Sequence, residues 1–169
     1  RRRRFCNRDG FADAATVVPQ NVQSNHGRMR ARRCAVQALY QWRVTQTSPV
    51  DIIGEFVADR ELVKVDIDYF SQLTRRIPEN YDELLTHITP ELDRGWARID
   101  TVEQAILLIG TYELQFCPEV PWRVVVNEAV NLCKMFGAQD AHKYINGVLD
   151  KIARAIRAIE ISSASSLEH

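Results

Sequence analysis

The fold is decided by residues 100–114, which read DTVEQAILLIGTYEL. Asp100 and Glu103 stand at the cap and third positions of a capping box, a common start of a helix. Apolar residues then recur at helical spacing: Ala105, Ile106, Leu108, Ile109, Tyr112 and Leu114. A helix that is apolar on most of its surface must be covered by other elements. The segment therefore predicts the central, deeply buried helix of a helical protein.

Amphipathic helical patterns flank this segment on both sides. Apolar residues at helical spacing predict further helices over residues 28–42, 49–58, 66–77, 81–88, 124–136 and 141–156. Pro78 should interrupt the third of these runs, and Gly137 should end the fifth in a left-handed cap. No alternation typical of β-strands competes with this pattern. We predict an all-α domain of about seven helices in two packed subbundles.

Composition places the chain among globular proteins. Its 169 residues are 46% hydrophobic and 26% charged, which suffices for one domain with an apolar core. No stretch approaches the roughly 18 to 20 consecutive apolar residues of a membrane-spanning helix. No apolar segment follows the basic residues 1–4, so a secretory signal is not indicated. We expect a cytoplasmic protein that does not bind membranes.

The four cysteines, Cys6, Cys34, Cys117 and Cys133, show no metal-ligand spacing. Cys34 and Cys133 fall within apolar helical patterns, where a reduced thiol packs as a small hydrophobic group. We therefore expect free thiols, and neither a metal site nor a cofactor.

The net charge of zero hides a division of the chain. Residues 1–43 hold ten arginines and two aspartates, whereas the remaining residues hold 12 basic and 20 acidic groups. Such an asymmetry predicts a basic segment that seeks a polyanion, attached to an acidic body.

Both ends are expected to lie outside the folded domain. Residues 1–27 lack a sustained period and contain many turn formers, so they predict either a disordered basic extension or sequence foreign to the protein. Residues 161–169 are typical of a flexible Ser-rich tail that ends in the remnant of an expression tag. The domain itself is predicted to span residues 28–160.

Three segments together resemble the NusB family. Residues 30–42 (RARRCAVQALYQW) are similar to the first helix of that family, and residues 98–114 to its central buried helix. The third match runs from residue 126 to residue 150 and is the most specific, since it includes KYINGVLD at 143–150. The matches follow the order and spacing of the family over nearly all of residues 28–157.

The resemblance implies a bacterial transcription antitermination factor without catalytic activity. Members of the family pair with the small-subunit ribosomal protein S-ten, also called NusE, and the two proteins bind boxA RNA. The assembly acts on elongating RNA polymerase together with other Nus factors, above all in ribosomal RNA operons.

Four arginines at the start of the first predicted helix are candidate RNA contacts: Arg28, Arg30, Arg32 and Arg33. Guanidinium groups bind phosphate oxygens in pairs and stack on bases. The alternative is a solvated basic face, but cations at a helix N-terminus oppose the helix dipole and gain nothing there without an external anion. Four phosphate contacts would give log K a slope of about −2.8 against log salt concentration.

A second candidate RNA contact lies at the start of the last predicted helix. Free backbone N–H groups and the positive end of the helix dipole favour a phosphate near Lys143. The ring of Tyr144 either stacks on a base or packs in the core. Asp140 is expected to cap the helix while its charge repels phosphate. In the family this corner lies beside the RNA.

Tyr40 and Glu103 match positions that face the ribosomal partner in the family. Tyr40 could equally border the core, and Glu103 is already explained by the capping box. We keep both as candidates for the partner surface.

Three other interpretations stay open. An enzyme would recruit a nucleophile or acid with a nearby base, as in Cys133 with His142, or His87 with Asp82 and Glu83, yet no phosphate-binding loop or hydrolase motif accompanies them. The domain is also related to RNA-binding domains that precede ribosomal RNA cytosine methyltransferases, but here only a Ser-rich tail follows Glu160. A homodimer that masks the RNA surface is compatible with the sequence.

Overall fold

A computed structural model of the chain describes residues 20–59 and 62–167, and within them it contains only helices. The α-helices are α1 (Gln20–Thr45), α2 (Pro49–Asp59), α3 (Ile67–Glu79), α4 (Tyr81–Ile88), α5 (Thr101–Phe116), α6 (Trp122–Phe136), α7 (Ala141–Ile156) and α8 (Ala158–Ser166). Two short 3₁₀ helices, η1 (Thr89–Glu91) and η2 (Trp96–Arg98), lie between α4 and α5. The predicted all-α class is confirmed, and eight helices over the described ranges are close to the seven expected.

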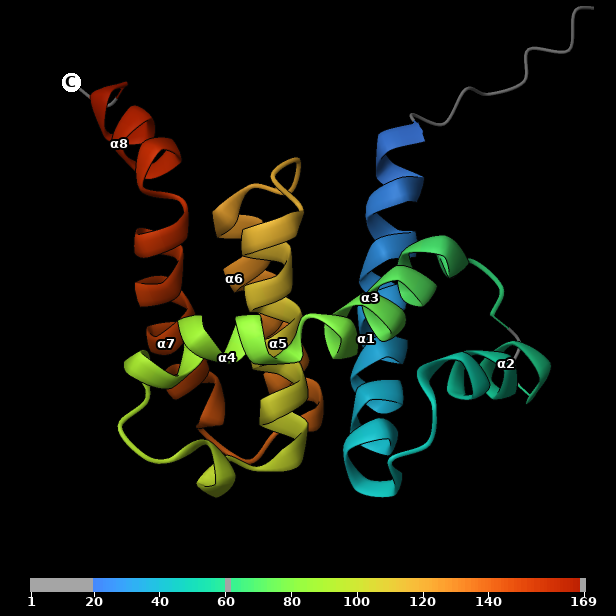
Figure 1. Ribbon diagram of the computed structural model, residues 1–169. Coiled ribbons are helices and arrows are strands. Elements are labelled where there is room, and N and C mark those ends of the chain that lie inside the picture. Colours follow the sequence, from blue (N-terminus) through green and yellow to red (C-terminus); the bar gives the residue numbers. More distant parts are fainter. Residues whose placement is uncertain (1–19, 60–61, 168–169) are drawn as a thin grey trace, which may run out of the picture.

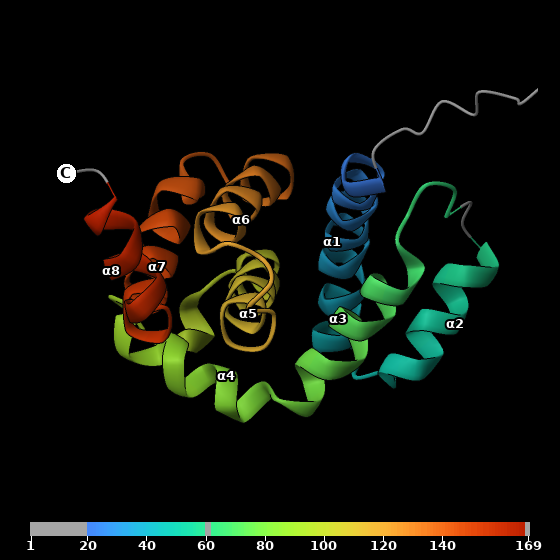
Figure 2. The same cartoon turned by 90° about the horizontal axis from the view of Figure 1, so that it is seen from above.

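The helices form two subbundles that meet along α1 and α5. In the first subbundle α1, α2 and α3 pack on one another, and in the second α4, α5, α6 and α7 do so. Figure 1 shows the first subbundle on the right and the second on the left. α3 passes almost directly into α4, so these two helices bridge the subbundles along one side of the molecule (Figure 2).

α5 is the central helix that its sequence predicts. Every residue from Gln104 to Leu114 is buried. The helix contacts α1 and α3 in one subbundle and α4, α6 and α7 in the other. Asp100 caps it, because the Asp100 carboxylate accepts a hydrogen bond of 2.9 Å from the backbone N–H of Val102.

The two ends of the helical region differ from the prediction. α1 begins at Gln20, so the end of the segment 1–27 is helical, and the buried Gly27 already belongs to the fold: its carbonyl accepts a hydrogen bond of 3.1 Å from the N–H of Asp66. Residues 158–166 form α8, where a flexible tail was expected from residue 161. Its serine hydroxyls donate to carbonyls one turn earlier. Our expectations for residues 1–19 and 168–169 lie outside the described residues.

The connection between α6 and α7 also differs from the prediction. Gly137 has a φ of −84° and is not left-handed, whereas Asp140 is, with a φ of 64°. Gly137 is required for space instead, since a Cβ there would lie 2.7 Å from the carbonyl oxygen of Cys133. Asp140 occupies the left-handed position because short polar side chains tolerate it better than most.

Gly110 allows α5 and α7 to approach closely. A Cβ at this position would lie 2.9 Å from both terminal methyl groups of Leu149 in α7. We expect G110A to lower the free energy of unfolding by about 1 to 3 kcal/mol, because Leu149 must shift within a filled core.

The matched control is G147A on α7. A Cβ at Gly147 meets no described atom within 4 Å, so this substitution should raise the free energy of unfolding by up to about 1 kcal/mol through helix propensity alone. Urea unfolding followed by circular dichroism measures both variants, and an equal effect of the two would contradict the packing argument.

Candidate nucleic-acid interface

A buried ion pair joins the two subbundles. Arg32 of α1 donates from Nε and Nη2 to the two carboxylate oxygens of Glu113 in α5, at 2.8 and 2.7 Å. The hydroxyl of Tyr69 in α3 donates to the same carboxylate at 2.6 Å. Arg32 is only 4% exposed and Glu113 only 1%. The prediction that Arg32 contacts RNA is therefore wrong, because its guanidinium is turned inward and its paired donors are already used.

The charges of this cluster are held in place by one another. Burial lowers the pKa of Arg32, but the hydrogen bond to Glu113 and the charge of that carboxylate outweigh burial and raise it above its ordinary value. Burial and the charge of Glu113 likewise raise the pKa of Tyr69. Arg32 thus stays cationic and Tyr69 stays neutral at neutral pH.

Arg28 lies one turn before Arg32 and is partly accessible. Its guanidinium carbon lies 4.5 Å from the centre of the Tyr69 ring, and its Nη1 lies 3.7 Å from a carboxylate oxygen of Glu119. The Nε of Arg28 is buried and has no hydrogen-bond partner among the described residues. The side chain borders a cavity of about 300 Å³ whose other lining residues are Asn25, Arg32, Glu119, Val120, Pro121, Val124 and Glu128. Arg28 therefore keeps donors that are not committed to the fold.

Arg30 and Arg33 are partly exposed on α1, and no described residue forms an ion pair or a hydrogen bond with either guanidinium. Both cations are therefore available to an external anion. Sequence reasoning treated all four arginines alike, whereas the structure separates two free side chains, one partly engaged and one buried.

At the start of α7, Asp140 and Lys143 lie together on the surface. The Nζ of Lys143 lies 3.6 Å from a carboxylate oxygen of Asp140, and both side chains are mostly exposed. The Asp140 carboxylate makes no capping hydrogen bond, so the prediction that it caps this helix is wrong: the left-handed backbone at Asp140 is not the geometry of a normal N-cap residue.

Tyr144 is held by two neighbours that sequence reasoning missed. Its hydroxyl donates to a carboxylate oxygen of Asp93 at 2.8 Å, and the guanidinium carbon of Arg94 lies 4.7 Å from the centre of its ring. Hydrogen bonds from Arg94 and Tyr144 lower the pKa of Asp93 to about 2. Asp93 and Arg94 lie in the loop between η1 and η2, which has no helical period, so no sequence signal connected them with a residue 51 positions away.

The candidate groups on α1 and α7 do not form one compact site. The candidate arginines lie in the third and fourth turns of α1, which Figure 1 shows on the right of the molecule, whereas the connection into α7 is at the lower left. A ligand that contacts both groups must be extended, which suits a single-stranded nucleic acid better than a small molecule.

The candidate partner residues are both accessible. Tyr40, on α1, is 44% exposed. Glu103, in the first turn of α5, is partly buried, and burial together with the charge of Asp100 raises its pKa. A backbone hydrogen bond from Ala138 favours the charged form of Glu103, so this carboxylate faces the connection between α6 and α7.

The geometry does not favour the enzyme interpretations. Burial raises the pKa of Cys133 to about 11, which is the opposite of what a nucleophilic thiolate requires. No described ion pair or hydrogen bond joins His87 to Asp82 or Glu83. In residues 20–59 and 62–167 there is also no cluster of three His, Cys, Asp or Glu side chains placed to hold a metal. Nor does any helix in these ranges combine the length and hydropathy needed to cross a membrane.

Comparison with known proteins agrees with the fold. The sequence model of the NusB family matches residues 29–154. The transcription antitermination protein NusB of Pasteurella multocida is 51% identical over 126 residues, which cover 75% of this chain and 88% of that protein. The chain belongs to the NusB family. The transcription antitermination protein NusB of Hydrogenovibrio crunogenus is 46% identical over 145 residues, which cover 86% of this chain and 90% of that protein.

A solved structure of T. maritima NusB is similar in three dimensions, with a TM-score of 0.56 and 28% sequence identity. The alignment covers 75% of this chain and 90% of that one. The range that matches the NusB family model starts one residue after Arg28 and ends within α7, so it includes every candidate RNA-binding and partner-binding residue except Arg28 and leaves out α8.

The inward position of Arg32 leads to a stability prediction. We expect R32M to lower the free energy of unfolding by about 3 to 5 kcal/mol, because the Glu113 carboxylate would remain buried without its cation. The control R33M, on the accessible side of the same helix, should change it by less than about 0.5 kcal/mol. Chemical denaturation measures both.

A triple variant distinguishes an unpaired charge from a simple packing defect. R32M/E113L/Y69F removes every polar member of the cluster and should recover most of the loss, because no buried charge or hydroxyl is left without a partner. A triple variant as unstable as R32M would show that the loss does not come from the charge.

Proposed function

We propose that this chain is a transcription antitermination factor that binds boxA-type single-stranded RNA together with ribosomal protein S-ten (NusE). Its membership of the NusB family and the names of its relatives support the antitermination role. We further propose that it acts in the cytoplasm as an adaptor without catalytic activity, within an elongating RNA polymerase complex that contains other Nus factors.

The observation that carries the RNA proposal is the pair of uncommitted cations on α1. Arg30 and Arg33 have no ion-pair or hydrogen-bond partner among the described residues, and Arg28 has a loose ion pair with Glu119 at 3.7 Å and a contact with the face of the Tyr69 ring. These three guanidinium groups can bind phosphate oxygens or stack on unpaired bases. Arg32 supports them indirectly, because its pairing with Glu113 fixes the rotation of α1.

The start of α7 supplies the second RNA contact. Lys143 and Lys151 border a pocket of about 370 Å³ beside Tyr144, and they offer cations for phosphate groups. Arg94 already lies over the Tyr144 ring. An incoming base must therefore displace Arg94 or stack on the outer face of its guanidinium, and both arrangements are common in RNA recognition.

We assign the partner surface to Tyr40 and Glu103. An exposed tyrosine provides a large contact area at little cost in side-chain entropy. The Glu103 carboxylate suits a basic protein surface, because a cation beside it would favour its charged form and oppose the rise in pKa that burial causes.

Electrophoretic mobility shift with boxA-type RNA tests the proposal. The chain alone should bind weakly, S-ten alone should bind weakly, and the two together should give a complex of higher affinity. Y40A and E103Q should weaken only the joint complex. The absence of any shift with the two proteins together would refute the proposal.

The salt dependence of RNA binding counts the arginine contacts. With Arg32 excluded, three phosphate contacts from Arg28, Arg30 and Arg33 contribute about −2.1 to the slope of log K against log salt concentration, and each phosphate contact from Lys143 or Lys151 adds about −0.7. R30Q/R33Q should make this slope less steep by about 1.4, because it removes two of the contacts. Fluorescence anisotropy at several salt concentrations measures the slope.

The control for this experiment is R154Q. Arg154 is an exposed cation on α7 that pairs with Asp150 at 2.9 Å, so its loss changes the net charge of the chain without removing a proposed phosphate contact. If R154Q changed the slope as much as R30Q alone or R33Q alone, only the net charge of the chain would matter.

Removing the charge of Asp140 should strengthen RNA binding. Asn tolerates the left-handed backbone at this position, so D140N removes the charge and leaves the turn intact. We expect affinity to rise about two- to fivefold at low salt, as the loss of one exposed repulsive charge predicts. D59N, at the end of α2, is the matched control and should leave the dissociation constant unchanged. Unchanged binding by D140N at matched salt would contradict the assignment of this corner to RNA.

A further inference from the structure

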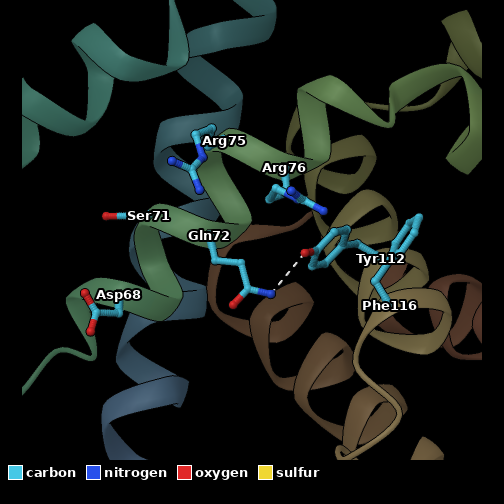
Figure 3. A pocket seen from close by; sticks show the side chains of 7 residues that line it. All are labelled: Asp68, Ser71, Gln72, Arg75, Arg76, Tyr112 and Phe116. Atoms are coloured by element: carbon cyan, nitrogen blue, oxygen red, sulfur yellow. Dashed lines mark hydrogen bonds between the residues drawn. The ribbon is translucent and has the colours of Figure 1, made fainter.

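A polar groove between α3 and α5 takes no part in the proposed RNA contacts. It has a volume of about 590 Å³, within the usual range of ligand pockets. One face of α3 and one face of α5 line it, with Asp68, Ser71, Gln72, Arg75, Arg76, Tyr112 and Phe116. Figure 3 shows these side chains, with Gln72 in the centre reaching toward Tyr112. We call this site the α3–α5 groove.

The floor of the groove presents a hydroxyl proton that the fold does not use. Tyr112 is 2% exposed, and its hydroxyl accepts a hydrogen bond of 3.0 Å from Nε2 of Gln72. No described residue accepts the proton of this hydroxyl, although the hydroxyl points into the groove (Figure 3). A buried donor without an acceptor suits a ligand that brings an oxygen.

Two adjacent arginines supply the charge for such a ligand. Arg75 has no ion-pair partner among the described residues, and Arg76 has only a long contact of 3.8 Å between its Nε and Glu79. Both guanidinium groups border the groove, and Figure 3 shows Arg76 extending toward the Tyr112 ring. Guanidinium groups bind carboxylates through two parallel hydrogen bonds.

An apolar wall lies next to these donors. The centres of the Tyr112 and Phe116 rings are 5.2 Å apart, and Phe116 is partly exposed. Arginine, tyrosine and phenylalanine are the residues enriched where proteins bind other proteins. The groove thus offers a carboxylate site and an adjoining apolar contact.

Its surroundings favour a protein segment over RNA. Asp68 and Glu79 lie beside the arginines and offset part of their positive charge, so the groove suits a single carboxylate better than a nucleic-acid backbone, which carries a charge on every nucleotide. The groove also lies on the side of α3 and α4, whereas α6, which lines the cavity beside Arg28, lies on the opposite side of the molecule (Figure 2). An RNA strand bound in the cavity beside Arg28 would not need to cross this groove.

We propose that the α3–α5 groove binds an acidic segment of a partner protein. A carboxylate of the segment pairs with Arg75 and Arg76 and accepts the Tyr112 proton, and a neighbouring apolar side chain packs on Phe116. This surface goes beyond the proposed binding of RNA and S-ten, and it gives the chain a separate attachment to a protein with Asp- or Glu-rich segments.

The test is a titration of the full chain with a capped peptide of sequence Glu-Leu-Glu-Glu-Leu, followed by NMR of the Arg Nε–H and Gln side-chain amide groups. We expect saturable shifts of Arg75, Arg76 and Gln72, with a dissociation constant of about 1 mM or tighter. R75Q/R76Q should weaken binding at least tenfold, and the folded spectrum should persist because both side chains are exposed. R154Q, on α7, should bind as the unaltered chain does.

Two further titrations, one with an uncharged peptide and one with RNA, test whether the groove binds another kind of ligand, and neither of them needs S-ten. The peptide Gln-Leu-Gln-Gln-Leu should give no saturable shifts, since it lacks the carboxylates. A boxA-type RNA should shift Arg30 and Arg33 and leave the groove unchanged. The proposal is overturned if the acidic peptide gives no saturable shifts at about 10 mM, if both peptides bind equally, or if RNA shifts the groove residues and displaces the peptide.

Discussion

The ion pair between Arg32 and Glu113 is the interaction on which the rest of this structure depends. It connects the first helix of one subbundle to the central helix of the other, and Tyr69 adds a third helix to the same carboxylate. Two charges are expensive to bury, so such a pair contributes little net stability over an apolar contact of the same size. Its value lies in geometry, because a bidentate pair is satisfied in only one rotation and one axial position of α1 against α5.

That rotation decides which arginines are free. Residues four apart share a face of a helix, so placing Arg32 inward also turns Arg28 toward the joint, where it meets Tyr69 and Glu119. Arg30 lies half a turn from both and is directed away from the joint. Arg33 is displaced by about 100° from Arg32 and likewise remains partly exposed. A run that reads as a uniform basic patch is therefore divided by helix geometry into structural and available cations.

Periodicity located the helices because the spacing of apolar residues reports which face is buried, and α7 shows this clearly, since its buried residues follow that spacing. The same method misjudged Arg32, since a run of charges is usually solvated and the partner lies 81 residues away. The usable signal was on the other side of the pair: Glu113 is an acid within an apolar helix, and a carboxylate there needs a buried cation. The preference of glycine for a left-handed helix cap also led us to predict that backbone at Gly137 and not at Asp140, because the sequence does not show which residue of a turn must fit beside the Cys133 carbonyl.

Arg157 applies the same physics to the other end of α5. It is 8% exposed and donates to the backbone carbonyls of Glu113, Leu114, Cys117 and Val120, at 2.7 to 3.1 Å. The last carbonyls of a helix have no partners within the helix, and a buried cation satisfies them and complements the negative end of the dipole. Glu113 is thus held twice, its side chain by Arg32 of α1 and its carbonyl by Arg157 at the end of α7. The helices that carry the two proposed RNA contacts are in this way tied to one residue of the central helix, so the distance between those contacts is set by the folded core and not by flexible loops. A fixed spacing of this kind lets the scaffold select an extended strand, because a bound strand gains both contacts only in the conformation that matches the spacing.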